Sequence, residues 1–148
     1  MSVVKIVETI KSIHPEHIIL VKIGEFYHVY GRDSYILSYL FKYKLKKVEN
    51  KTSSCGFPSS GINRILANLE QNEISYLILD RRNNYEVDEK VDSKKNAYKN
   101  VFDKAYDYVR LKNRIDTIYD YMIDNIFKQD FQRVIVEVEN ILYERRKI

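Results

Sequence analysis

The chain has 148 residues, a formal net charge of +4 and one cysteine. This length allows one domain, or one domain with a small helical appendage. The single cysteine excludes a fold held by internal disulfides, because Cys55 has no possible partner within the chain. No apolar run approaches the about 18 residues of a membrane span, and the first residues are unlike a signal peptide, so we expect a cytoplasmic protein without a membrane partner.

The first residues of the sequence predict a helix that leads into a strand. Ser2 is a suitable N-cap, and apolar residues recur at three- and four-residue spacing from Val3 onward. Pro15 ends this pattern because proline lacks the N–H that a helix interior needs. The apolar run Ile18–Ile23 then has the length and the β-branched content of a strand.

A second strand should follow at once and pair with the first. Gly24 allows a sharp turn, and residues 26–30 carry strand-forming side chains, so we expect an antiparallel hairpin. Side chains point alternately to the two faces of a strand. We therefore expect Tyr27 in the core, with Phe26 and His28 on the opposite face.

The middle of the sequence predicts helices that alternate with strands. Asp33 or Ser34 can cap a helix, and the lysine-rich segment 44–49 favours an edge strand. Residues 50–54 are polar and predict a loop. Beyond them we expect a short strand or turn over 55–58 and a helix from 61 or 63 to 71. Two strands should follow, over 75–80 and 85–91. This order predicts an α/β fold with a mixed sheet flanked by helices.

The composition changes from Ser93 onward. Glycine and proline are absent from this point, and long amphipathic patterns begin. Apolar residues at helical spacing predict either one long helix or two helices broken near Lys112. Asp130 can cap a final helix. We therefore expect an α/β domain over residues 1–92, followed by an α-helical hairpin over residues 93–148.

The hairpin cannot cover both of its apolar faces by itself. It should therefore contact the α/β domain, a second copy of the chain or another protein. The side chains expected in this partner-binding surface are Tyr98, Val101, Ile115, Tyr119, Met122, Val134 and Val138. Asp116, Asp120 and Asp124 form an acidic stripe, a pattern that belongs to a solvated face more often than to a binding surface.

The sequence lacks the residue patterns of an enzyme or a metal-binding protein. It has no Gly-x-x-x-x-Gly-Lys-(Ser/Thr) loop for nucleotide phosphates. Cys55 and His28 are conceivable as a nucleophilic pair, but a lone cysteine is more often a small buried residue. His14 and His17 lack neighbouring ligands that would complete a zinc site. We therefore expect no catalytic residue, no metal and no cofactor.

Other groups in the sequence suit a nucleic-acid partner. Phe26 offers a ring for stacking, and His28 can donate or accept a hydrogen bond. Lysines attract a polyanion, although a lysine-rich solvated face is an equally common pattern. The candidate nucleic-acid-binding residues are Phe26, His28, Lys22, Lys42, Lys44, Lys46, Lys47 and Lys51. The alternative is that Phe26 belongs to the core and His28 is an ordinary surface residue.

Five short motifs follow one another between residues 13 and 91. They are His14-Pro15-Glu16, Lys22-Ile23-Gly24-Glu25-Phe26-Tyr27-His28, Gly56-Phe57-Pro58, Leu66-Ala67-Asn68-Leu69 and Tyr76-Leu77-Ile78-Leu79-Asp80-Arg81. In this order and spacing they resemble MutS domain I, the mismatch-recognition domain of the DNA-repair protein MutS. That family has glutamate at the position of His28, and Glu-Gln where this chain has Asp80-Arg81.

The resemblance implies a role for Phe26. In MutS the matching phenylalanine enters the minor groove and stacks on a mispaired base, which kinks the duplex. The family glutamate hydrogen-bonds to the same base. His28 lacks the carboxylate of that contact, so the resemblance implies general binding of DNA or RNA more strongly than mismatch recognition.

Two functions are compatible with these observations. The first is a non-catalytic nucleic-acid-binding accessory protein that lacks the MutS ATPase. The resemblance extends to small MutS-like proteins that accompany the reverse transcriptase of diversity-generating retroelements. The second is a protein-interaction module, in which the MutS-like fold is a scaffold and the helical hairpin docks on a larger enzyme or forms a homodimer.

Overall fold

A computed structural model of the chain describes residues 2–146. The chain divides into two compact units, Met1–Val109, called here the α/β unit, and Arg110–Ile148, called the helical unit. Helix α4 contributes residues to both units. The domain boundary expected between residues 92 and 93 stays a prediction.

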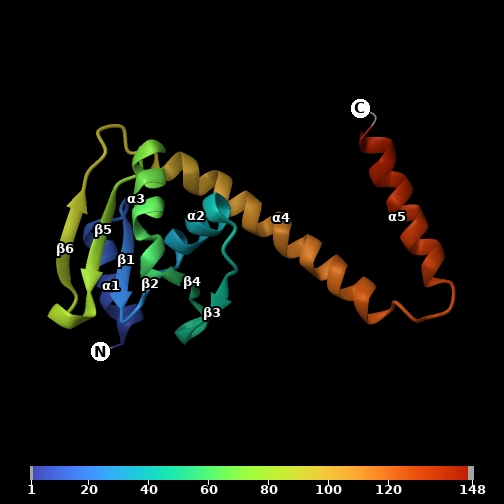
Figure 1. Ribbon diagram of the computed structural model, residues 1–148, viewed down its shortest axis with the longest axis horizontal. Helices are drawn as coiled ribbons and strands as arrows, with labels where there is room; N and C mark the ends of the chain where they lie inside the picture. Colours follow the sequence, from blue (N-terminus) through green and yellow to red (C-terminus); the bar gives the residue numbers. More distant parts are fainter. Residues whose placement is uncertain (1, 147–148) are drawn as a thin grey trace. The chain divides into compact units, whose positions relative to one another are not determined.

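The α/β unit is built on a six-stranded mixed sheet with the strand order β3-β4-β2-β1-β5-β6 (Figure 1). Its strands are β1 (Ile18–Ile23), β2 (Phe26–Tyr30), β3 (Lys46–Lys47), β4 (Ser53–Pro58), β5 (Tyr76–Asp80) and β6 (Glu86–Val91). Strand β1 is antiparallel to β2 and parallel to β5, whereas β2 with β4, β3 with β4, and β5 with β6 are antiparallel. This confirms the predicted α/β class and the mixed sheet.

Helices cover both faces of the sheet (Figure 1). The helices of the chain are α1 (Val3–Ile13), α2 (Arg32–Phe41), α3 (Ile62–Gln71), α4 (Tyr98–Asp124) and α5 (Phe131–Arg146). Helix α1 packs on one face of the sheet through Val7. Helices α2, α3 and the start of α4 pack on the other face, which carries the larger core. Ile18 to Val21 in β1 are buried on both faces, which explains their continuous apolar run.

Several predicted element boundaries differ from the structure. Helix α4 is continuous over Tyr98–Asp124, so the alternative with a break near Lys112 is wrong. The segment expected as a loop over 50–54 already joins the sheet at Ser53, because Ser53 and Ser54 pair with β3 and Ser54 also pairs with β2. The predicted edge strand over 44–49 contains just two paired residues.

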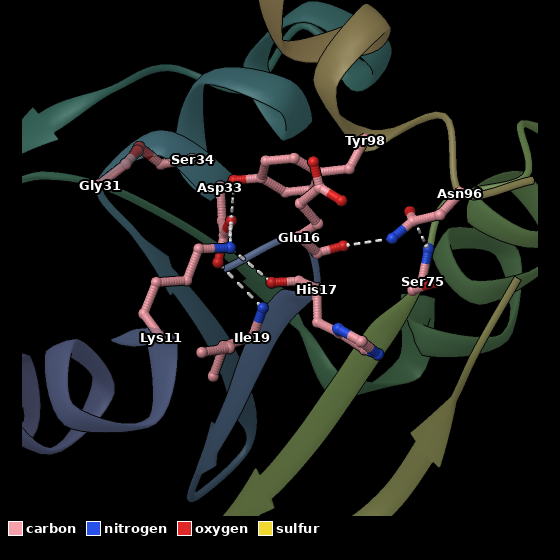
Figure 2. Close-up of polar contacts among 10 residues, drawn as sticks. All are labelled: Lys11, Glu16, His17, Ile19, Gly31, Asp33, Ser34, Ser75, Asn96 and Tyr98. Atoms are coloured by element: carbon pink, nitrogen blue, oxygen red, sulfur yellow. Dashed lines mark hydrogen bonds and ion pairs between the residues drawn. The ribbon is translucent and has the colours of Figure 1, made fainter. Parts of the chain in front are cut away.

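Neither Asp33 nor Ser34 caps helix α2, in contrast to the prediction. Gly31 occupies the N-cap position, with no side-chain cap bond, and Asp33 is buried in the first turn. Its carboxylate accepts hydrogen bonds from the Lys11 ammonium at 2.6 Å, the Tyr98 hydroxyl at 2.5 Å and the Ile19 backbone N–H at 3.0 Å (Figure 2). This set of four residues, the Asp33 network, joins α1, β1, α2 and α4.

Burial controls the ionisation of the Asp33 network. It raises the pKa of the Asp33 carboxyl, although the donors from Lys11, Tyr98 and Ile19 oppose this effect. Burial also lowers the pKa of Lys11 and raises the pKa of the Tyr98 hydroxyl. Lys11 makes a second bond, to the His17 carbonyl, and lies 4.3 Å from the centre of the Tyr98 ring. The partners therefore depend on one another for their polar contacts.

A second set of bonds holds the segment between β6 and α4. Asn96 donates from its amide to the Glu16 carbonyl at 3.0 Å and accepts from the Ser75 N–H at 3.3 Å (Figure 2). The Ser75 hydroxyl accepts from the Ser93 N–H at 2.8 Å. These contacts place the start of α4 beside β1 and β5, where Tyr98 reaches Asp33.

The helical unit contains the second half of α4 and helix α5. Phe131 and Asn125 are its buried side chains among the described residues, and the Phe131 ring lies 6.5 Å from that of Tyr121. The sequence predicts Asp130 as the cap of α5. Asp130 directly precedes this helix and has a positive φ, and its backbone carbonyl accepts a hydrogen bond from the Arg133 N–H. No helix within residues 2–146 is long and apolar enough to cross a membrane.

Replacing Tyr98 by Phe tests the Asp33 network. The variant leaves a buried carboxylate without one of its donors, so we expect the free energy of unfolding to fall by about 1–3 kcal/mol. Urea denaturation of the full chain measures this change. Tyr106→Phe is the matched control on the same helix, because Tyr106 is exposed, and it should change stability by less than about 0.5 kcal/mol. Equal stability of both variants would contradict the role given to the network.

Candidate nucleic-acid interface

Strand β2 carries a row of three rings on the face of the sheet against which α1 packs. The β2 row consists of Phe26, His28 and Tyr30, which alternate with the buried Tyr27 and Val29. The ring centres lie 6.5 Å apart between Phe26 and His28, and 6.4 Å apart between His28 and Tyr30. Phe26 is 49% exposed, so the alternative that it belongs to the core is wrong. Tyr27 is buried, as its place in the strand predicts.

Gly56 makes room for the middle ring of this row. It lies opposite His28 in strand β4. A Cβ at this position would lie 3.2 Å from His28 Nδ1 and 3.1 Å from the Tyr27 carbonyl oxygen. Because glycine has no Cβ, the imidazole can lie against β4. The backbone at Gly56 therefore helps to determine where the histidine ring points.

The surroundings of His28 favour its neutral form. Partial burial lowers the pKa of the imidazole below its ordinary value, and the nearby positive charge of Lys46 lowers it further. A neutral imidazole carries one N–H donor and one nitrogen acceptor. At neutral pH the ring therefore offers one donor and one acceptor, and when the pH falls it becomes a cation, the form that attracts phosphate.

The predicted lysines fall into separate groups. Lys46 pairs with Ser54, which pairs with Tyr30, so Lys46 lies on the face of the β2 row. Lys47 donates to the Ser53 hydroxyl at 3.1 Å and lines a cavity together with Lys51. Lys44 is exposed in the segment before β3. Of these four lysines, Lys46 is the one that acts on His28.

Lys22 and Lys42 do not join the β2 row. Lys22 pairs with the buried Tyr27, so by strand alternation its side chain lies on the opposite face of the sheet. The Lys42 ammonium donates to the Tyr39 carbonyl at 2.9 Å and lies 4.3 Å from the centre of the Tyr108 ring. Sequence spacing placed these lysines near Phe26 along the chain, but the fold directs them elsewhere.

The predicted partner-binding residues also occupy different environments. Tyr98 is buried and bonded to Asp33, and Val101 packs against the core of the α/β unit, so Tyr98 offers no surface to a partner. In the helical unit Ile115 is 64% exposed and Tyr119 is 62% exposed. The remaining three, all in the helical unit, are exposed or partly exposed: Met122, Val134 and Val138.

Cys55 is a core residue. It pairs with Val29 on the core face of β2, whereas His28 lies on the opposite face, so the two cannot form a nucleophilic pair. Burial raises the pKa of Cys55 to about 12, which keeps the thiol protonated and unreactive. Among the residues that the structure describes, no three His, Cys, Asp or Glu side chains group as a metal site.

Two residues of the candidate interface were not predicted from the sequence. Tyr30 stands two residues beyond His28, and the same alternation that separated Phe26 from Tyr27 could have found it. Gly56 could not be found in this way, because its role depends on the pairing of β4 with β2. The candidate interface therefore includes the β2 row, Gly56 and Lys46.

The fold and this surface define a mixed α/β recognition domain that presents aromatic rings on a sheet. The family model of MutS domain I matches residues 2–114, which is most of the chain, and the chain belongs to this family. In MutS this domain recognises mismatched DNA, so the chain carries a domain of a nucleic-acid-binding family. A search of the curated proteins found no match.

Proposed function

We propose that the chain is a non-catalytic, cytoplasmic accessory protein that binds DNA or RNA through the β2 row. The observation that carries this proposal is the Phe26 ring, which is half exposed at the start of β2 in a domain of the MutS domain I family. An exposed ring can stack on a base of any sequence, at about 1–3 kcal/mol per base. Lys46 supplies a positive charge on the same face.

The identity of residue 28 favours general binding over mismatch recognition. A carboxylate accepts hydrogen bonds and repels phosphate, whereas a neutral imidazole both donates and accepts. His28 therefore can contact several base edges and does not repel the backbone of a strand. The partners proposed here are single strands, structured RNA and distorted duplexes, in which bases are open to stacking.

Replacing Phe26 by Ala should weaken nucleic-acid binding. Loss of one stacked base at about 1–3 kcal/mol corresponds to roughly 5- to 150-fold in Kd. The measurement is fluorescence anisotropy with single-stranded DNA, single-stranded RNA, and matched and mismatched duplexes, repeated at several salt concentrations. Phe127→Ala is the matched control, because this phenylalanine is 99% exposed in the helical unit. Wild-type protein that binds none of these below about 100 μM at low salt would refute the proposal.

His28 should make this binding depend on pH. The pKa of the free imidazole is lowered, and a bound polyanion favours the imidazolium, so binding takes up a proton. Affinity should therefore rise roughly three- to tenfold as the pH falls from about 7 to about 5. His28→Gln should abolish most of this rise in affinity. The variant retains His14 and His17, so any pH dependence that remains in it comes from groups other than His28. The same pH dependence in both proteins would exclude His28 from the interface.

A second proposed function rests on the exposed apolar side chains of the helical unit. They are Leu111, Ile115, Ile118, Tyr119, Tyr121, Ile123, Ile126, Phe127, Val134, Val136, Ile141, Leu142 and Tyr143. So many exposed apolar groups on two helices indicate a protein-binding surface. We propose that this unit docks on a protein partner, such as a reverse transcriptase of a diversity-generating retroelement, or on a second copy of the chain.

A second copy of the chain is the occupant that the following experiment tests. Ile115 and Tyr119 lie one turn apart on α4 and both are exposed, so they belong to one apolar face of the helix. The double substitution Ile115→Glu with Tyr119→Glu should convert a dimer into a monomer in sedimentation equilibrium. Asn113→Glu with Thr117→Glu has the same spacing on the other side of the helix and should stay dimeric. A monomeric wild-type protein at about 100 μM would exclude the homodimer.

A further inference from the structure

A cavity of about 510 Å³ lies within the α/β unit, beside the end of the β2 row. It is bounded by α1, the start of α2, the β3–β4 segment and the first turns of α4. Tyr30, the last ring of the β2 row, lines it. This volume is within the range of small-molecule sites. The cavity is therefore large enough for one nucleotide and continuous with the candidate interface.

One wall of the cavity is aromatic. This aromatic wall consists of Tyr35, Phe102 and Tyr106. Tyr35 lies 6.3 Å from Phe102 and 6.5 Å from Tyr106 between ring centres, and Phe102 lies 6.2 Å from Tyr106. Tyr106 is 51% exposed, so one ring of the wall is open to a ligand. A planar heterocycle is the kind of group that stacks on such a wall.

The cavity is also lined by cations. Lys47 and Lys51 line it from the β3–β4 segment. Arg32 also lines it, with its guanidinium held 4.3 Å from the centre of the Phe102 ring. Among the described side chains around the cavity, Glu8 is the single acid. Lys11 contributes little free charge because it is paired with Asp33. An anion is therefore favoured beside the aromatic wall.

We propose that this cavity binds one nucleotide, with its base on the aromatic wall and its phosphate held by Lys47, Lys51 and Arg32. The combination of an open ring and several cations suits a ligand that is both planar and anionic. Because Tyr30 joins the cavity to the β2 row, a bound strand can place one nucleotide here and stack others on His28 and Phe26. The proposal goes beyond the proposed function, since a free nucleotide does not need Phe26.

The test is a calorimetric titration of the full chain with adenosine 5′-monophosphate, with adenosine and with inorganic phosphate as separate ligands. We expect the monophosphate to bind more tightly than either fragment. The double substitution Lys47→Ala with Lys51→Ala should weaken its binding by about tenfold or more. Tyr106→Ala should weaken it by roughly five- to 150-fold. Lys94→Ala with Lys95→Ala is the matched control, because these exposed lysines lie outside the cavity.

Several results would overturn the proposal. One is the absence of saturable binding of the monophosphate up to about 10 mM. Another is equal affinity for inorganic phosphate, which would remove the aromatic wall from recognition. An equal loss in the Lys94 and Lys95 control would indicate nonspecific charge. Phe26→Ala separates the two sites, because it should weaken strand binding and leave the affinity for the monophosphate unchanged.

Discussion

The buried carboxylate of Asp33 is the contact on which the arrangement of the α/β unit depends. It receives donors from α1, β1 and α4 while it belongs to α2. A buried carboxylate that loses a donor is strongly unfavourable, so packings that separate these elements are disfavoured. The cavity is formed by three of the same elements, α1, α2 and α4. A polar contact in the interior thus joins three of the elements that line a surface site.

The two faces of the sheet have different roles. Helices α2, α3 and the start of α4 close one face over the main core, in which Tyr27 stacks on Phe57. Helix α1 covers the other face less completely, so Phe26 on that face stays half exposed. The strand that supplies the core therefore also supplies the candidate interface, through residues one position apart. This arrangement keeps the Phe26 ring on a rigid element, where little order has to be gained on binding.

The helical unit is more exposed to solvent than the α/β unit. Its described side chains are mostly exposed, including many large apolar ones, and Phe131 with Asn125 forms the small buried part. This exposure is the observation on which the proposed protein-binding role of the unit rests. The family match ends at residue 114, near the start of this unit. A recognition domain joined to an apolar helical segment is the organisation that both proposed functions share.

Much of the fold could be predicted from local pattern, because periodicity reports the environment of each segment. The alternation of β2 predicted Tyr27 in the core and Phe26 on the opposite face of the strand. The unbroken apolar run of β1 reflects burial on two faces. Tertiary structure decided what local pattern cannot encode. Asp33 is of a residue type that often caps helices, yet contacts from distant elements make it a buried hydrogen-bond acceptor. Gly56 lies beside His28 only because strand β4 pairs with strand β2. The lysines were close in sequence but were separated by the pleat and by the end of α2, because side-chain direction depends on register and packing.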